Sequence, residues 1–336
     1  MSDSIKVNRS TAAGRPSGRR HRQSTLSRVA SQNVLWLVIV VIFLVFALTA
    51  PNFLSITNLF NIVLHISIIG IIAVGMTFVI IAGGIDLSVG SMVALSGILA
   101  AFIARDSRYG TILPIIGAVG VGALAGCVMN GLLISEQKLN PFIVTLASMS
   151  IYRGVGFVLT GAKPIYNLND AFLSFSTYKI GSVLPIPVAI FLFIVLIAYL
   201  FQRSFVLSRH VYIVGGSQEV AYFAGIPVKR VLIFVYTLSG ALTGLAGVLL
   251  TSRVGSGDPN LGLGYELSAI AAVIIGGTSL KGGRGGIEKT ITGILIIALI
   301  DNGLSLLNVF SYWQEIIQGV IILIAVQLDI WRYGIR

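Results

Sequence analysis

Long apolar segments follow one another along this chain and are separated by short polar loops. Several of them reach the ~20 residues that an α-helix needs to cross a hydrocarbon core about 30 Å thick. Two are shorter, so they need extension into their polar flanks or protection by neighbouring helices. We therefore predict an all-α, polytopic membrane protein with about ten transmembrane helices. The segments are residues 34–50, 58–82, 88–104, 112–134, 142–160, 184–202, 231–252, 266–279, 290–309 and 314–330, and the short ones are 88–104 and 266–279.

The composition agrees with a membrane protein. Charged residues make up 10% of the chain and the mean hydropathy is +0.95, whereas a soluble domain carries about 25% charged residues. Glycine is abundant, and Gly122-x-x-x-Gly126 and Gly240-x-x-x-Gly244 have the spacing that lets helices pack closely. The single cysteine, Cys127, allows no disulfide framework within the chain, and no Cys/His pattern has metal-ligand spacing.

The basic residues are distributed as membrane topology requires, which argues against nucleic acid as the partner of a chain with net charge +11. Residues 1–32 are predicted to be a disordered, basic cytoplasmic tail that sets orientation, with lipid headgroup contact as the alternative. Residues 33–332 form the predicted transmembrane domain, with an outward loop at 161–183 and a cytoplasmic segment at 203–230. With ten spans, seventeen Lys/Arg lie on the tail side and five on the other, so both termini are predicted to be cytoplasmic. The five are Arg105, Arg108, Lys163, Lys179 and Arg253.

Residues 75–97, GMTFVIIAGGIDLSVGSMVALSG, show a helix–break–helix pattern. Gly83 and Gly84 interrupt an apolar helical run. Asp86 and Ser88 then open a second helix, where an aspartate can accept hydrogen bonds from free N–H groups and is favoured by the helix dipole. An unsatisfied backbone group in lipid costs several kcal/mol, roughly, so the break requires such partners. We predict a structural break near the cytoplasmic face, and a direct functional role for Asp86 stays open.

The cytoplasmic segment contains the signals of a short helix outside the membrane. Ser217 can cap its start, and Glu219 in the first turn suits the helix dipole. Gly225 can supply a left-handed residue after the last turn, and Pro227 prevents continuation. The apolar and aromatic side chains of the predicted helix, 218–224, indicate a docking site for another protein, with a helix lying in the bilayer interface as the alternative.

Polar groups inside the apolar segments are candidates for a hydrophilic path. A buried charge is costly and usually faces the protein interior or a wet cavity. For Arg153 the alternative is a pairing or carbonyl clamp between helices, and for Asp301 and Glu315 it is a position near an interface. The residues predicted to line a translocation path are Asn130, Arg153, Asp301 and Asn302.

The sequence shows no catalytic constellation. His65 and His210 have no acidic or cysteine partner at useful spacing, and no serine lies in a nucleophile motif. GTSLKGG has P-loop glycine spacing, but Gly283 stands where the lysine must be and no strand precedes it. We therefore predict a protein that is not an enzyme and holds no cofactor, so that any ATP use belongs to a partner.

Four stretches, in order, resemble the membrane permeases of ribose-type sugar ABC importers, the branch that also holds galactose, xylose, allose and rhamnose permeases. The similarity covers roughly residues 35 to 332. One departure is GGIEK, where Glu288 and Lys289 replace the usual small apolar residues. The stretches are GMTFVIIAGGIDLSVGSM (75–92), NPFIVTLASMSIYRGVGFVLTG (140–161), GGSQEVAYFAGIPVKRVLIFVYTLSGALTGLAGVLL (215–250) and GLGYELSAIAAVIIGGTSLKGGRGG (262–286).

The resemblance implies a multi-pass permease of the bacterial inner membrane that imports a monosaccharide by alternating access. It implies cytoplasmic ATP-binding subunits, an extracytoplasmic sugar-binding protein, and a second copy or a sister permease. The alternative is an ion-coupled secondary transporter of a small polar solute, which would need an intramembrane acidic relay. On the resemblance, helix 218–224 seats in the ATPase, and the expected coupling residues are Gly215, Glu219, Tyr222, Ala224 and Gly225.

Overall fold

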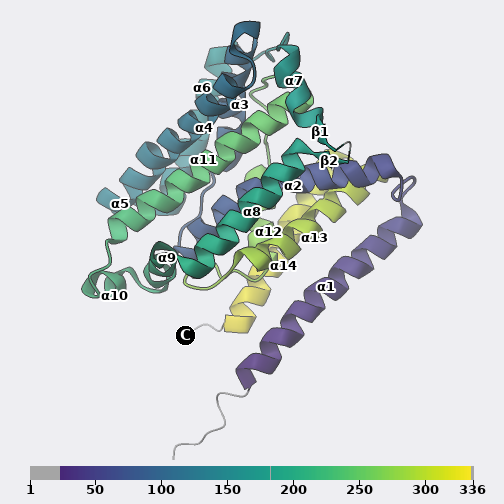
Figure 1. Ribbon diagram of the computed structural model, residues 1–336. Coiled ribbons are helices and arrows are strands. Elements are labelled where there is room, and N and C mark those ends of the chain that lie inside the picture. Colours follow the sequence, from purple (N-terminus) through teal and green to yellow (C-terminus); the bar gives the residue numbers. More distant parts are fainter. Residues whose placement is uncertain (1–22, 182, 334–336) are drawn as a thin grey trace, which may run out of the picture.

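The computed structural model describes residues 23–181 and 183–333 and is mostly helical (Figure 1). The first half holds α1 (Gln23–Thr49), α2 (Ile56–Ile81), α3 (Val89–Ala104), a 3₁₀ turn (Ser107–Tyr109), α4 (Ile112–Ala125), a π-helical segment (Gly126–Leu132), α5 (Leu133–Glu136), α6 (Pro141–Thr160) and α7 (Asp170–Thr177). The second half holds β1 (Lys179–Ile180), β2 (Leu184–Pro185), α8 (Ile186–Ser204), α9 (Val206–Gly216), α10 (Gln218–Phe223), α11 (Val228–Val254), α12 (Tyr265–Ile275), α13 (Ile287–Leu306) and α14 (Ser311–Tyr333).

The helices confirm a polytopic membrane protein. Among the described residues, six helical units are long and apolar enough to cross a membrane: α2, α4 to α5, α6, α8, α11 and α13. Three shorter apolar helices accompany them: α3, α12 and the Val34–Thr49 part of α1. β1 and β2 form a two-residue antiparallel pairing, with Lys179 opposite Pro185.

The first helix begins earlier than the sequence indicates. α1 starts at Gln23, inside the segment 1–32 that we expected to be a disordered tail. Extending an existing helix adds one hydrogen bond per residue without a new nucleation cost, so a spanning helix can continue into a polar flank. The rest of the predicted tail, residues 1–22, lies outside the described residues.

Both long loops contain helices that the hydropathy pattern does not reveal. α7 lies in the outward loop, and Asn169 caps it by accepting a hydrogen bond from the Phe172 N–H. α9 lies in segment 203–230, where Val211 and Val214 recur at helical spacing and are buried in the apolar cluster that contains Ile81. Both helices are too short to stand out as membrane spans.

α12 is a half-length helix that starts close to the predicted segment 266–279, which we expected to be short, and ends four residues before the predicted end. Its 11 residues cover about 16 Å at 1.5 Å per residue, roughly half of the hydrocarbon core. An irregular segment leads into it from the end of α11. Gly257 in that segment exchanges backbone hydrogen bonds of 2.9 and 3.0 Å with Ile165 of the outward loop. Gly262 lies against Gly90, in the first turn of α3, so α12 begins at the depth where α3 starts.

Close glycine contacts join α4 and α11. A Cβ built on Gly122 would overlap the carbonyl of Gly240, and one built on Gly240 would overlap the carbonyl of Gly122. Gly126 and Gly244 sit equally close to the backbone of the facing helix. The predicted glycine packing is therefore confirmed, and each of these positions requires the absence of a side chain.

The bundle has two distinct ends (Figure 1). α7 and the β1–β2 pairing lie at one end, and α9 and α10 lie at the other. The start of α1 and the end of α14 lie at the α9–α10 end. Large apolar side chains are exposed along α1, α6, α8 and α14, as expected for surfaces that face lipid or another membrane protein.

Candidate functional site

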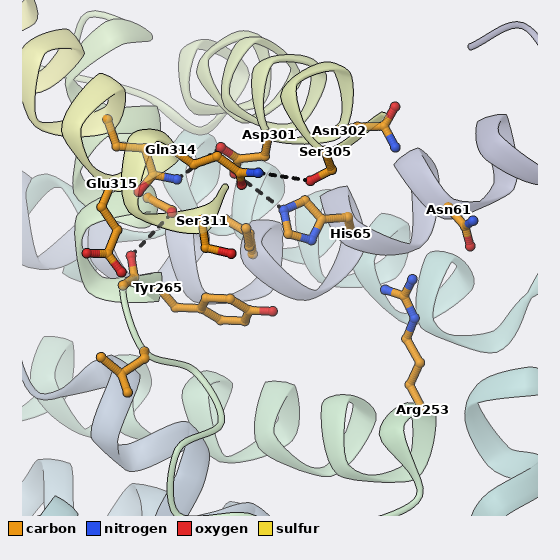
Figure 2. Close-up of a pocket in the computed structure, with 15 residues that line it drawn as sticks. Asn61, His65, Arg253, Tyr265, Asp301, Asn302, Ser305, Ser311, Gln314 and Glu315 are labelled. Carbon is orange, nitrogen blue, oxygen red and sulfur yellow. Dashed lines mark hydrogen bonds and ion pairs between the residues drawn. The ribbon is translucent and has the colours of Figure 1, made fainter. Parts of the chain in front are cut away.

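A polar cavity of about 430 Å³ lies among five helices of the bundle (Figure 2). It is formed where the first third of α2 meets the end of α13 and the start of α14, with the end of α11 and the start of α12 completing the wall. Its volume falls in the ~300–1,000 Å³ range of small-molecule sites. The lining residues are Asn61, His65, Ile69, Arg253, Leu263, Gly264, Tyr265, Ser268, Asp301, Asn302, Ser305, Ser311, Gln314, Glu315 and Gln318.

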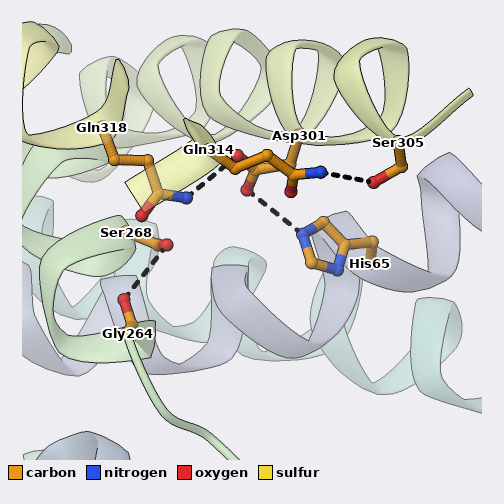
Figure 3. A network of polar contacts seen from close by, with 7 residues as sticks. All are labelled: His65, Gly264, Ser268, Asp301, Ser305, Gln314 and Gln318. Carbon is orange, nitrogen blue, oxygen red and sulfur yellow. Dashed lines mark hydrogen bonds and ion pairs between the residues drawn. The ribbon is translucent and has the colours of Figure 1, made fainter. Parts of the chain in front are cut away.

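Asp301 is fixed within the cavity wall from two sides (Figure 3). Its Oδ1 accepts a hydrogen bond from Gln318 Nε2 at 2.9 Å. Its Oδ2 lies 3.5 Å from His65 Nε2, and the side chains of Asp301 and His65 are 13% and 28% exposed. Asp301 therefore lies among α2, α13 and α14 and lines the cavity.

Amide side chains brace the same wall. Asn302 Nδ2 donates to Asn58 Oδ1 at 2.8 Å, and Asn58 Nδ2 returns a hydrogen bond to Asn302 Oδ1 at 2.9 Å. Gln314 Nε2 donates to the Val309 carbonyl at 2.9 Å and to Ser305 Oγ at 3.3 Å. These contacts connect α2, α13 and α14 around the cavity.

The start of α12 forms the facing wall. Gly264 precedes the helix with φ +79°, a left-handed conformation that glycine adopts without strain. Ser268 Oγ donates to the Gly264 carbonyl at 3.2 Å, and the Tyr265 ring lies edge-on to His65 at 6.4 Å between centroids. The positive end of the α12 dipole therefore points toward the cavity, and Figure 2 shows Arg253 reaching it from α11.

Arg153 and Asn130, which we also predicted to line the path, do not line this cavity. Arg153 Nη1 donates to the carbonyls of Pro259 and Leu261, the second at 3.0 Å, and so holds the irregular segment before α12. This is the carbonyl clamp that the sequence left open. Asn130 belongs to the π-helical segment and is 1% exposed, so it faces packed interior in this conformation.

The break between α2 and α3 places Asp86 at the centre of a buried network. Its Oδ1 accepts from Ser88 Oγ at 2.5 Å, from the Ser88 N–H at 3.1 Å and from Asn130 Nδ2 at 3.3 Å. Its Oδ2 accepts from Ser239 Oγ at 3.0 Å. Gly83, with φ +84°, and Gly84 lie in the turn just before it. The N-cap of α3 is Ser88 rather than Asp86, so Asp86 acts mainly as a junction of three helical elements.

The short helix predicted at 218–224 lies where the capping pattern places it. α10 spans Gln218–Phe223, with Ser217 Oγ accepting from the Val220 N–H at 3.3 Å. Glu219 is in its first turn, Ala224 follows its last residue, and Gly225 has φ +76°. Two aromatic side chains project from it: Tyr222 is 71% exposed and Phe223 is 85% exposed.

α9 connects this exposed helix to the interior. Gly215 lies directly against the Ile81 carbonyl at the end of α2 and against Gly283 in the glycine-rich loop between α12 and α13. Tyr212 Oη donates to the Gly285 carbonyl at 2.9 Å. Burial raises the pKa of the Tyr212 hydroxyl to about 12, so it remains a donor at physiological pH. α9 therefore contacts both the end of α2 and the loop that follows α12.

The sequence singled out Asp301 and Asn302, which line the cavity, but not the residues that contact them. His65 and Gln318 contact Asp301, and Asn58 contacts Asn302. A signal was present: Asn58, Asn61 and His65 recur at spacings of three and four residues, which places them on one face of α2. Such a polar stripe along an apolar span predicts a wet interior surface.

The reciprocal amide pair supports a stability prediction. Asn302→Ala leaves Asn58 without its side-chain partner, so we expect a loss of about 1–2 kcal/mol, as for the stronger interhelical hydrogen bonds in membranes. Thermal unfolding in nanodiscs measures the loss. The Asn58→Ala, Asn302→Ala double variant serves as the control: it should be less destabilised than the sum of the two single variants. Strict additivity would show that the pair contributes nothing.

Comparisons with known proteins identify the family. The family described as branched-chain amino acid transport system / permease component matches residues 58–326. The ribose import permease protein RbsC of Bacillus subtilis is 43% identical over 292 residues, which cover 86% of this chain and 89% of that protein. The D-allose transport system permease protein AlsC of Escherichia coli is 37% identical over 293 residues, covering 87% and 89%. The L-arabinose ABC transporter permease protein AraH of Azospirillum brasilense is 39% identical over 303 residues, covering 89% of this chain and 88% of that protein.

No solved structure matches the chain. Since the family match covers most of the chain and these relatives align over nearly their whole length, the chain belongs to the family of ABC-importer permease components.

Proposed function

We propose that this chain is the membrane permease of an ATP-driven monosaccharide importer and forms the translocation path for the sugar. The observation that carries the proposal is the placement of two features on α2. The polar cavity lies beside the first third of α2, and the segment that ends in the exposed α10 contacts its last residue, Ile81. A solute site and a docking site at opposite ends of one buried helix suit a protein that couples the two.

The proposed topology has ten spans and cytoplasmic termini. The ten units are α1, α2, α3, α4 to α5, α6, α8, α11, α12, α13 and α14, with α12 completed by the irregular segment before it. The excess of basic residues on the tail side supports this orientation. In it, α9 and α10 face the cytoplasm, and the cavity lies in the outer half of the bundle, where a solute arrives.

A sugar is the proposed solute because the relatives in the preceding comparison are named as permeases for ribose, D-allose and L-arabinose. Asp301 and Asn302 are the path residues that contact the cavity. Asn130 and Arg153 serve the path indirectly, by holding the helix break and the approach to α12.

The family implies ATP-binding subunits and a solute-binding protein as partners. We place the ATP-binding subunits on α10 and the solute-binding protein on the outer face near α7. ATP hydrolysis belongs to the partner subunits, and no cofactor is assigned to this chain. A second copy of the chain, or a sister permease, would complete the path between two subunits, while the remaining exposed apolar faces contact lipid.

Coupling would run through the contacts of α9. Closure of the ATP-binding subunits moves α10, and α9 carries the motion to Ile81 through Gly215 and to Gly285 through Tyr212. The first contact shifts the end of α2, and the second shifts the loop that follows α12. Because α2 and α12 both line the cavity, both motions reach the solute site. The relatives favour this ATP-driven mechanism over ion coupling.

Removing the aromatic side chains of α10 should separate the permease from its ATPase. We expect the double variant Tyr222→Ser, Phe223→Ser to weaken association by ~30-fold or more, since buried aromatic residues at interface hot spots contribute about 2 kcal/mol or more. Co-purification with the cognate ATP-binding subunit and ATP-dependent uptake of D-ribose, D-allose and L-arabinose into proteoliposomes are the measurements.

The matched control is Phe310→Ser, Tyr312→Ser, which removes two exposed aromatic side chains that do not belong to α10: Phe310 directly precedes α14 and Tyr312 lies in its first turn. This control should retain the ATPase. Undiminished association of the α10 variant would contradict the docking assignment. Uptake driven by a proton gradient in vesicles without any ATPase would overturn the proposed function itself.

A further inference from the structure

The Asp301 carboxylate has hydrogen-bonding capacity that the protein does not use. A carboxylate accepts about four hydrogen bonds, and each Asp301 oxygen has one polar neighbour: Gln318 Nε2, which donates to Oδ1 at 2.9 Å, and His65 Nε2, which lies 3.5 Å from Oδ2 (Figure 3). The group is held in one orientation by α14 and α2 while it lines the cavity. It is therefore an oriented acceptor with remaining lone pairs that can face a solute.

The facing wall offers complementary groups. Tyr265 and Ser268 lie in the first turns of α12 and line the same cavity, and Figure 2 shows the Tyr265 ring below the Asp301–His65 pair. A tyrosine ring presents an apolar face to C–H groups as well as a hydroxyl at its tip. A solute between these walls meets hydrogen-bonding groups on one side and an aromatic ring on the other.

The charge and polarity of the lining restrict the class of solute. Two carboxylates, Asp301 and Glu315, and one arginine, Arg253, line the cavity. The positive end of the α12 dipole adds only about half a charge, so an anionic solute still meets an excess of negative charge. Among the residues that line the cavity, Ile69 and Leu263 are the aliphatic ones. The site lacks the apolar wall that a branched aliphatic side chain requires and suits a neutral molecule rich in hydroxyl groups.

We infer that the permease itself contains a sugar-binding subsite in this cavity, in which hydroxyl groups of the sugar donate to Asp301 and the Tyr265 ring covers its C–H face. The inference rests on the proposed function and deepens it, since it makes the permease a second selector after the binding protein. His65 and Gln318 are positioning residues that orient the Asp301 carboxylate. The subsite selects neutral polyols and disfavours the corresponding acids.

The test is direct binding to the full-length permease in nanodiscs, without the binding protein. Saturation-transfer NMR measures the affinities of D-ribose, L-arabinose and D-ribonate. We expect millimolar binding of the neutral sugars and roughly tenfold weaker binding of D-ribonate, which is similar in size but carries a charged carboxylate. Asp301→Asn should weaken D-ribose binding roughly tenfold, because hydrogen bonds to a charged acceptor are about twice as strong as neutral ones. It should also reduce the discrimination against D-ribonate.

Gln318→Met provides a second variant. It retains the Asp301 carboxylate but removes the hydrogen bond from Gln318 that holds the carboxylate in one orientation. It should weaken D-ribose binding by about threefold while leaving the discrimination against D-ribonate in place, because the charge remains. The matched control is Asp106→Asn, which removes a carboxylate in the loop after α3 that is paired with Arg108 outside the cavity. This control should bind all three probes as the unmodified protein does.

The outcomes that contradict the sugar-binding subsite differ from those that contradict the proposed function. If the unmodified protein binds no neutral sugar at 100 mM, or if both cavity variants bind like the control, the subsite inference is overturned. ATP-dependent sugar uptake that persists in that case leaves the proposed function standing. Loss of both uptake and ATPase association in the unmodified protein would instead overturn the proposed function.

Discussion

Gly122→Leu is expected to prevent stable folding of the permease. Gly122 lies so close to α11 that even a Cβ would overlap the Gly240 carbonyl, and backbone atoms cannot move aside as a flexible side chain can. A leucine there must push α4 away from α11, the helix whose residues also hold Asp86 through Ser239. Overpacking of this severity costs about 3 kcal/mol or more. Size-exclusion chromatography and thermal unfolding of the detergent-purified protein measure the effect.

Gly120 supplies a control on the same helix. A Cβ built on Gly120 meets no atom within 4 Å, so Gly120→Leu adds the same side chain to α4 without a clash. This variant should remain monodisperse and unfold at or above the temperature of the unmodified protein, because leucine favours a helix more than glycine does. Equal stability of the two variants would show that the α4–α11 contact can relax and that close packing is not required there.

Local chemistry explains why part of this structure could be predicted from the sequence. The spacing of the glycines within α4 and within α11, the cap at Ser217 and the left-handed Gly225 are each decided within a few residues of chain, although which helix the glycines contact is not. The apolar periodicity likewise placed most of the membrane spans to within a few residues. In each case the physical requirement is local, so the residues that meet it are neighbours in sequence.

The cavity could not be predicted because it depends on which helices meet. His65 and Asp301 are separated by 236 positions, and Asn58 and Asn302 by 244. Each of these four residues lies on an apolar helix. From the sequence, an isolated polar residue in such a helix is equally consistent with a position near a membrane interface and with a packed position in the core. Only the packing of α2 against α13 and α14 shows that the polar faces converge.

The sequence predicted that α12 is short but did not show how its start is protected, for a related reason. Its apolar run resembles a short span, but Gly262 and Gly264, both with positive φ, start the helix inside the bundle. The irregular segment before it is tolerated because Arg153 satisfies the carbonyls of Pro259 and Leu261. Backbone of this kind occurs at membrane depth only where protein or a cavity satisfies it, so the start of α12 and the cavity depend on the same packing.

Asp86→Ala is expected to destabilise the protein nearly as strongly as the clash at Gly122. The carboxylate is 1% exposed and accepts hydrogen bonds from Ser88, Asn130 and Ser239. These donors lie in the start of α3, the π-helical segment and α11, so their removal affects three elements. Each buried group left without a partner costs about 1–3 kcal/mol, and the losses combine to about 3–6 kcal/mol. Thermal unfolding in nanodiscs measures the change.

Two further variants separate the role of the hydrogen bonds from that of charge and volume. Asp86→Asn preserves the shape of the side chain and one acceptor oxygen. The Ser239 hydroxyl can rotate to accept a hydrogen bond from the new amide. This variant should therefore lose less than half as much stability as Asp86→Ala. Asp106→Ala removes an exposed carboxylate paired with Arg108 and should change stability little, because exposed ion pairs contribute weakly. If Asp86→Ala unfolds at the same temperature as Asp106→Ala, the network does not hold the break together. In that case the close backbone approach of Gly83 and Gly215, just after α2 ends, would be the contact that fixes the break.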